Sequence, residues 1–145
     1  MTKIKAISGW PLRAFCNDPI SKGDFCYIVY NEPETKSDLF YGSGIVHKYD
    51  GAELSGVSLN DVVEIDLKVD RLKHDEVQCG GMINILTDGV VVLKVKGENL
   101  SHNTPVYVTK KGNLSSKLKK KKRPLVGHTC SSQDKEGFVQ VRLSL

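Results

Sequence analysis

Short apolar runs separated by turn signals follow one another along this chain, most regularly between Gly81 and Leu143. Each run is rich in β-branched or aromatic residues and is closed by a glycine-bearing turn, which is typical of consecutive strands rather than of helices. We expect strands over residues 82–86, 90–96, 106–109, 125–129 and 138–143. The pattern therefore predicts a small all-β module in this half of the chain.

Two glycine turns in this half predict β-hairpins. Thr87-Asp88-Gly89 separates the first two expected strands, and Asp-Gly is among the strongest short hairpin signals. Lys110-Lys111-Gly112-Asn113 separates residues 106–109 from Leu114 in the same way. Each turn is expected to join two neighbouring antiparallel strands.

The first half predicts further strands. Residues 25–30 carry apolar side chains on both faces, as in a strand that is covered on both sides. Residues 39–47 are expected to form a second strand, in which Gly42 and Gly44 indicate a bulge or a close backbone approach. Residues 62–70 alternate strictly, with Val63, Ile65, Leu67 and Val69 expected to face the core. The acidic side chains on the other face of that strand are then solvated.

The amino-terminal region is predicted to be extended and to lie outside the core. Residues 1–5 hold little that can be buried, so we expect an arm or the beginning of an edge strand. Residues 7–19 mix bulky apolar groups with Pro11 and Pro19, which suits a strap draped over the core. The helical candidate, residues 115–122, is stopped by Pro124 within about two turns.

A chain of 145 residues is long enough for one domain with a real core and too short for two comfortable ones. We therefore expect a single β domain over residues 1–145, with the arm and strap in 1–19 and the clearest β module in 80–143. The expected fold is a compact antiparallel β-barrel or β-sandwich, jelly-roll-like, with little or no helix.

Positive charge is concentrated in one segment, although the net charge is only +4. The residues concerned are Lys117, Lys119, Lys120, Lys121, Lys122 and Arg123. This basic tract can be a solvated loop, a contact to an acidic protein surface or a contact to nucleic acid. No aromatic residues are interleaved with it, so nucleic acid is not expected as the main partner.

The sequence contains no clear signature of a catalytic site, a metal site or a membrane-spanning segment. Gly42-Ser43-Gly44 lacks the spacing of a nucleophile elbow, and the four histidines lack the spacing of metal ligands. Cys16, Cys26, Cys79 and Cys130 form no Cys-x-x-Cys pair and are expected to be reduced and buried. No apolar stretch reaches membrane-spanning or signal-peptide length. We expect no enzyme activity, no metal, no cofactor and no membrane contact.

Residues 80–143 resemble the small head-decoration, or cement, proteins of tailed bacteriophages. The resemblance lies in the order of four pieces: Gly-Gly-Met-Ile-Asn-Ile-Leu-Thr-Asp-Gly-Val-Val-Val-Leu-Lys-Val, Thr-Pro-Val-Tyr-Val-Thr-Lys-Lys-Gly-Asn-Leu, Pro-Leu-Val-Gly-His and Gly-Phe-Val-Gln-Val-Arg-Leu. It implies a compact β protein on the outside of an assembled capsid, in the virion, after synthesis in the host cytoplasm. The implied partners are the major capsid protein and sister copies, in a dimer or trimer.

On this hypothesis the strap and the basic tract contact capsid subunits or a sister copy. The candidate contact residues are Trp10, Leu12, Arg13 and Phe15, together with Lys117, Lys119, Lys120, Lys121, Lys122 and Arg123. The alternative is a small nucleic-acid-binding β-barrel that uses the basic tract. A third reading is an enzyme whose site the sequence does not reveal.

Overall fold

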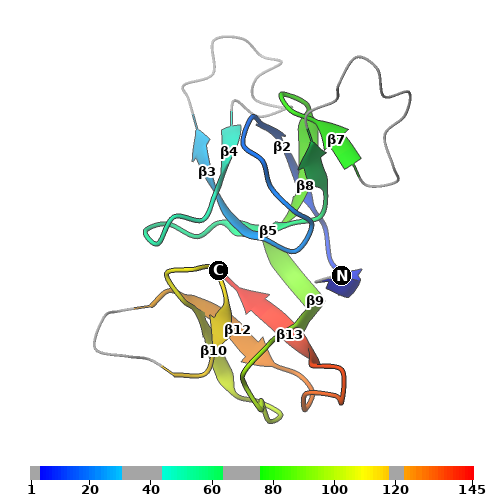
Figure 1. The fold of residues 1–145 in the computed structure, drawn as a ribbon, viewed down its shortest axis with the longest axis vertical. Helices are drawn as coiled ribbons and strands as arrows, with labels where there is room; N and C mark the ends of the chain where they lie inside the picture. The colour runs from blue at the N-terminus through cyan, green and yellow to red at the C-terminus, as the bar shows by residue number, and fades with distance from the viewer. Residues whose placement is uncertain (1–3, 31–43, 64–75, 118–122) are drawn as a thin grey trace.

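The computed structural model describes residues 4–30, 44–63, 76–117 and 123–145, and these residues form strands and loops without a helix. The strands are arranged in two parts, one above the other in Figure 1. The upper part is a closed barrel and the lower part is a curved six-stranded sheet. The prediction of an all-β fold is confirmed, and of the two expected forms, barrel or sandwich, the structure contains a closed barrel. Because no helix is present in the described part of the chain, none there could cross a membrane.

Five strands close the barrel in the order β2, β4, β3, β5, β8. Their bounds are Leu12–Cys16 for β2, Phe25–Tyr30 for β3, Gly44–Lys48 for β4, Gly56–Ser58 for β5 and Met82–Leu86 for β8. All neighbours are antiparallel except β2 and β4, which run parallel. The barrel is therefore mixed, because a long connection through β3 brings β4 back alongside β2.

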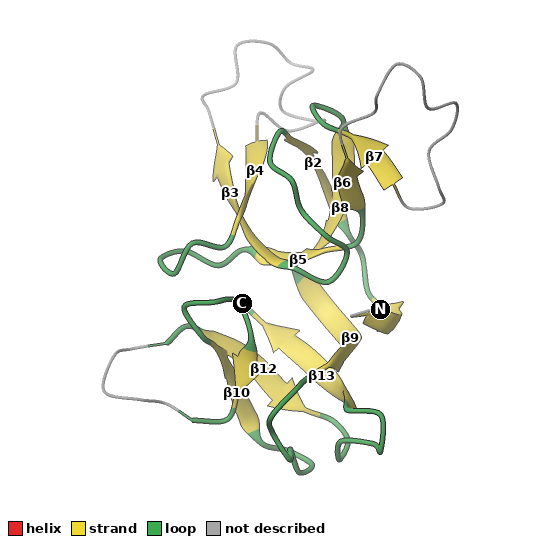
Figure 2. Ribbon diagram, in the orientation of Figure 1, coloured by secondary structure: helices red, strands yellow, loops and turns green. Residues whose placement is uncertain are grey.

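The six-stranded sheet is antiparallel throughout, in the order β1, β9, β13, β12, β10, β11. Its strands are Ile4–Ser8 (β1), Asp88–Lys94 (β9), Pro105–Val108 (β10), Leu114–Ser115 (β11), Leu125–Thr129 (β12) and Phe138–Ser144 (β13). Two short strands, β6 (Asp61–Val63) and β7 (Glu76–Gln78), pair in parallel beside the barrel (Figure 2).

The hairpin predicted at Thr87-Asp88-Gly89 is wrong. Strand β8 pairs with β2 and β5, whereas β9 pairs with β1 and β13, so the chain runs from the barrel straight into the sheet. Gly89 has φ +129°, and a Cβ added there would lie 2.2 Å from the Ser8 carbonyl oxygen. The glycine therefore permits the close approach of β1 and does not make a turn.

The other strand predictions of the second half are confirmed. Strands β10 and β11 form an antiparallel hairpin through Lys110-Lys111-Gly112-Asn113, and Gly112 has φ +86°. Strands β12 and β13 pair across the polar loop that follows Thr129. The predicted strand over 25–30 is β3. Most of the strands predicted over 39–47 and 62–70 lies outside the described residues, as does most of the helical candidate, which begins with Ser115 in β11.

The strap prediction for residues 7–19 is corrected. Its first residues belong to β1, an edge strand of the sheet, and its middle is β2, a wall strand between β4 and β8. Ala14 and Cys16 face the barrel interior and are 3% and 0% exposed. Ile4 begins β1, so the expectation that residues 1–5 hold the beginning of an edge strand is confirmed there, but Ile4 is buried, contrary to the expectation of little burial. Proline at position 11 precedes β2, where a missing N–H breaks no pairing inside the strand.

Two clusters of buried apolar side chains form the core. One lies inside the barrel and includes Cys16, Ile83 and Ile85. The other joins the sheet to the barrel, because it contains Leu86 and Val57 from barrel strands together with sheet residues such as Val141. The shared cluster supports the view that residues 1–145 form a single domain, which stays a prediction.

Candidate interaction surfaces

An apolar row crosses the outside of the barrel. Phe15 on β2 pairs with Met82 on β8 and with Ile45 on β4, and Ile45 in turn pairs with Val29 on β3. Residues that are directly paired point to the same face of a sheet. The alternate residues of these strands fill the barrel, so these four side chains point outward. Phe15 and Val29 are 43% and 42% exposed, and we call Met82, Phe15, Ile45 and Val29 the apolar row.

The predicted contact residues of the amino-terminal region are all exposed. Trp10 lies between β1 and β2, and 91% of it is accessible to solvent. Leu12 is 45% exposed at the start of β2. Arg13 is exposed and points to the same side as Phe15, two residues later. The structure therefore gathers Trp10, Leu12, Arg13 and Phe15 at one strand, while their role stays a prediction.

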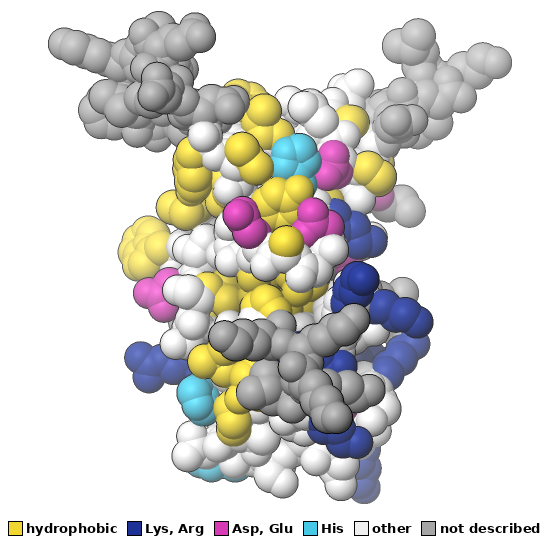
Figure 3. All heavy atoms as spheres, turned by 90° about the vertical axis from the view of Figure 1, so that its left-hand side faces the viewer, with side chains coloured by type: hydrophobic (Ala, Val, Ile, Leu, Met, Phe, Trp, Pro, Cys, Tyr) yellow, Lys and Arg dark blue, Asp and Glu magenta, His cyan; other side chains and the backbone are white. Residues whose placement is uncertain are grey.

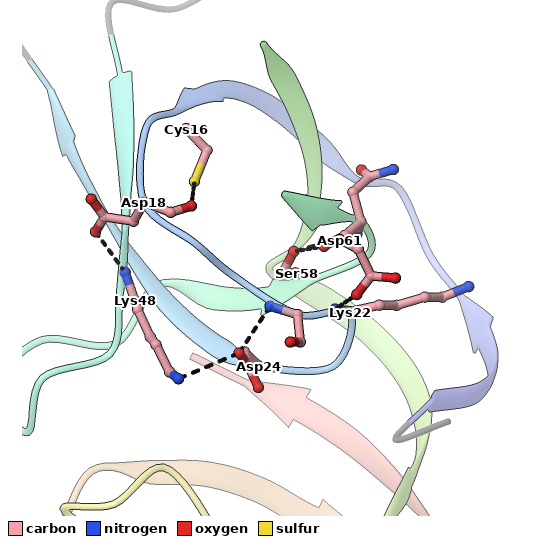
Figure 4. Close-up of polar contacts among 9 residues, drawn as sticks. Cys16, Asp18, Lys22, Asp24, Lys48, Ser58 and Asp61 are labelled. Atoms are coloured by element: carbon pink, nitrogen blue, oxygen red, sulfur yellow. Dashed lines mark hydrogen bonds and ion pairs between the residues drawn. The ribbon is translucent and has the colours of Figure 1, made fainter. Parts of the chain in front are cut away.

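A network of polar contacts holds the connection between β2 and β3 against the barrel (Figure 4). The Asp18 carboxylate accepts a hydrogen bond of 3.3 Å from the backbone N–H of Lys48. The Lys48 ammonium lies 3.8 Å from the Asp24 carboxylate, which also accepts a hydrogen bond from the Ser21 N–H. The backbone N–H of Lys22 donates to Asp61 at 2.7 Å. These contacts fasten the connection to the end of β4 and to β6.

Asp18 also contacts His47, with 3.1 Å between its Oδ2 and the Nδ1 of the ring. The His47 ring lies 5.3 Å from that of Tyr27, measured between centroids. Desolvation and the nearby carboxylate of Asp50 raise the pKa of Tyr27. An Asp–His pair orients the base in hydrolases, but such a site also needs a nucleophile. Ser43, the nucleophile weighed from the sequence, lies outside the described residues, and the pair anchors the end of β4.

The basic tract is described only at its two ends. Lys117 is exposed, and the Arg123 guanidinium donates a hydrogen bond of 2.7 Å to the Lys117 carbonyl oxygen. This contact closes the base of the loop. Lys119, Lys120, Lys121 and Lys122 lie outside the described residues. The proposed contact role of the tract therefore stays a prediction.

Two concave regions lie where the barrel meets the sheet. The larger, of about 1080 Å³, is lined by Leu12 and Tyr30 from the barrel and by His128, Arg142 and Leu145 from the sheet, among others. The smaller, of about 380 Å³, is lined by residues 23–25, 93–96 and 112–114. Figure 3 shows hydrophobic side chains at this junction, with most of the Lys and Arg side chains around it and below. The second region is the more strongly basic of the two.

All four cysteines are free, in agreement with the sequence prediction of reduced thiols. Cys16 and Cys26 are buried, but Cys130 is exposed and corrects the expectation that all four are buried. His128 and Cys130 are both exposed at the end of β12. Within the ranges that the structure describes, no group of three His, Cys, Asp or Glu side chains could hold a metal ion.

The cysteines are expected to differ sharply in reactivity. Burial, with smaller effects from the charges of Cys16 and Asp24, raises the pKa of Cys26 from 9.0 to about 12. Iodoacetamide near pH 8 should therefore modify Cys130 quickly and leave Cys26 unmodified until the protein unfolds, because the thiolate is the reactive form. Because the pKa of Cys26 is higher in the folded protein, the folded state is favoured while this thiol is protonated. This contribution to the free energy of unfolding is fully present below pH 9 and is lost as the pH rises toward 12.

Peptide mass spectrometry after timed labelling measures this difference directly. The Cys130→Ser variant is the control, since it should lose the fast modification and no other. Equal labelling rates at Cys26 and Cys130 in the folded protein would contradict the burial of Cys26.

A scan against models of known protein families finds no match for this chain, and a search of curated protein sequences finds none either. The surfaces described above are therefore interpreted from their own geometry. Sequence reasoning did not place Met82, Ile45 and Val29 in one row with Phe15. One signal in the sequence could have indicated this surface. Residues 25–30 are apolar on both faces, so one face of this strand, which carries Val29, is apolar and points away from the barrel interior.

Proposed function

We propose that this protein is a capsid decoration, or cement, protein that binds the outside of an assembled phage head and bridges neighbouring major capsid subunits. The observation that carries the proposal is the apolar row on the barrel exterior, close in sequence to the exposed Trp10 and Leu12. Exposed apolar surface on a rigid scaffold is typical of a protein interaction site. The resemblance of residues 80–143 to decoration proteins names the class of partner.

The physical benefit of such binding is stabilisation of the assembled shell by mass action. A protein that binds the assembled, expanded lattice and not the free subunits shifts the equilibrium toward the lattice. Each copy needs only a modest interface, because the contacts are repeated over the whole shell. Phe15 and Trp10 are the expected anchors, since aromatic side chains dominate the binding energy of many interfaces. Sister copies contact one another on the shell as a dimer or trimer.

Cosedimentation with emptied, expanded phage heads that lack decoration tests the proposal. Phe15→Asp should weaken binding by at least about thirtyfold, the usual effect of losing an interface anchor. Leu125→Asp is the matched control, because Leu125 is 40% exposed but lies on β12 of the sheet, away from the apolar row. The control should bind as the unmodified protein does.

Two results would overturn the proposal. One is the absence of binding to such heads by the unmodified protein. The other is tight, steeply salt-dependent binding to oligonucleotides without binding to heads, which would favour the alternative of a nucleic-acid-binding β-barrel that uses the basic tract.

A further inference from the structure

The smaller concave region lies between three segments that are distant in the sequence. Residues 23–25 come from the turn that leads into β3, residues 93–96 from the end of β9, and residues 112–114 from the turn that leads into β11. Its floor is apolar, because Phe25, Leu93, Val95 and Leu114 are each no more than 6% exposed. It is therefore a groove with an apolar floor at the junction of barrel and sheet. We call it the lysine groove, after the lysines that line it.

Positive side chains rim this groove. Lys94 and Lys96 line it, and Lys111 directly precedes Gly112, which also lines it. Lys96 and Lys111 are exposed, and neither forms an ion pair within the part of the chain that the structure describes. Like charges brought together in this way create a positive potential that attracts anionic groups. The rim therefore favours a negatively charged ligand.

Two nearby carboxylates are held by contacts within the protein. Asp24 lines the groove, but it is only 8% exposed and is engaged by the Ser21 N–H and by Lys48. Glu98 accepts hydrogen bonds from the hydroxyl groups of Ser115 and Ser116. Over the whole chain, residues 87–145 hold 12 Lys and Arg against 4 Asp and Glu, while residues 1–86 hold 9 against 13. The second part of the chain, residues 87–145, which forms most of the sheet, therefore carries a net positive charge.

Two features favour a peptide over nucleic acid as the occupant. The one aromatic ring that lines the groove, that of Phe25, is buried in the floor, so no exposed ring is available on which a base could stack. The apolar floor can take the apolar side chains of a peptide, which a nucleic acid lacks. Strand β11 offers no free backbone edge beside the groove, because Leu114 and Ser115 are each only 6% exposed.

We propose that the lysine groove binds an extended acidic segment of a partner protein. The apolar floor accommodates alternate side chains of the segment, and the carboxylates of the others lie against Lys96 and Lys111. This inference goes beyond the capsid role and does not depend on it, since the segment can belong to any protein partner of this chemistry.

Fluorescence anisotropy with a short fluorescein-labelled peptide of alternating Glu and Val tests the inference. The double variant Lys96→Glu with Lys111→Glu should bind at least about tenfold more weakly than the unmodified protein, because it reverses two rim charges. Lys135→Glu with Arg142→Glu is the matched control. It changes the net charge equally at two exposed positions that do not line the groove, and it should bind within about threefold of the unmodified protein. Binding should weaken as salt rises, since the screening length falls to about 8 Å at physiological ionic strength.

Each other outcome overturns the inference. Equal weakening in the two double variants would show a general charge effect, and unchanged binding in the groove variant would place the peptide elsewhere, such as on the basic tract. The absence of peptide binding by the unmodified protein would also overturn it. An oligothymidylate that binds more tightly than the peptide and depends on the same two lysines would make nucleic acid the occupant.

Circular dichroism of both double variants checks that they are folded. The variant Lys96→Gln with Lys111→Gln removes the two charges without reversing them, and it should give an intermediate loss of affinity.

Discussion

Replacing Gly127 by alanine is expected to lower the free energy of unfolding by at least about 4 kcal/mol, which is exceptional for a single methyl group. A Cβ at this position would lie 1.8 Å from the Arg142 carbonyl oxygen and 2.9 Å from its carbonyl carbon. Both atoms belong to the backbone of β13, the direct partner of β12. No side-chain rotation relieves the clash, so β12 has to move away from β13 in the interior of the sheet.

Denaturant unfolding followed by circular dichroism measures this loss. Gly97→Asn is the control, because a Cβ at Gly97 meets nothing within 4 Å and its φ of +74° is one that asparagine tolerates. That variant should change the free energy of unfolding by less than about 1 kcal/mol. A similar loss in both variants would contradict the account given for Gly127.

Replacing Leu86 by alanine should cost about 2–5 kcal/mol of folding free energy, the usual range for a fully buried leucine. Leu86 belongs to a barrel strand and is 0% exposed, yet its contacts lie in the core cluster of the six-stranded sheet. The cavity left by the substitution would therefore open at the junction of the two parts. We expect barrel and sheet to unfold in one transition before and after the change.

Hydrogen exchange of the β13 amides tests this cooperativity. Ile83→Ala is the comparison, since Ile83 is 0% exposed within the barrel cluster and belongs to no cluster of the sheet. In a single domain, Ile83→Ala lowers the protection of β13 by as much as it lowers the total stability. Unchanged protection of β13 in that variant would show two independently stable units and contradict the single-domain prediction.

The local features of the fold were predictable from the sequence. Strands β3, β8, β12 and β13 coincide with, or lie within a residue or so of, the expected apolar runs. The β10–β11 hairpin follows from its Lys-Lys-Gly-Asn turn. These predictions succeed because strand formation and tight turns depend on side chains and backbone conformations that are close together in the chain. The position of the basic tract belongs to the same local level, whereas the exposure of Leu12, Arg13 and Phe15 depends on the place of β2 in the barrel wall.

The partners of each strand were not predictable in this way. Asp88-Gly89 has the composition of a hairpin, but the chain continues into the sheet because Ser8, about eighty residues earlier, occupies the space that Gly89 leaves open. The parallel pairing of β2 with β4 also has no local signal.

The sequence by itself determined that this protein is made of strands, where β3 and the strands of the second half lie, and where its charge is concentrated. Only the tertiary structure decided that Met82, Phe15, Ile45 and Val29 form one row and that Lys94 and Lys96 line one groove together with Gly112. The physical reason is that both surfaces depend on register between segments far apart in the chain. Register is selected by the burial of the whole core, and a one-residue slip would turn every side chain of a strand to its other face.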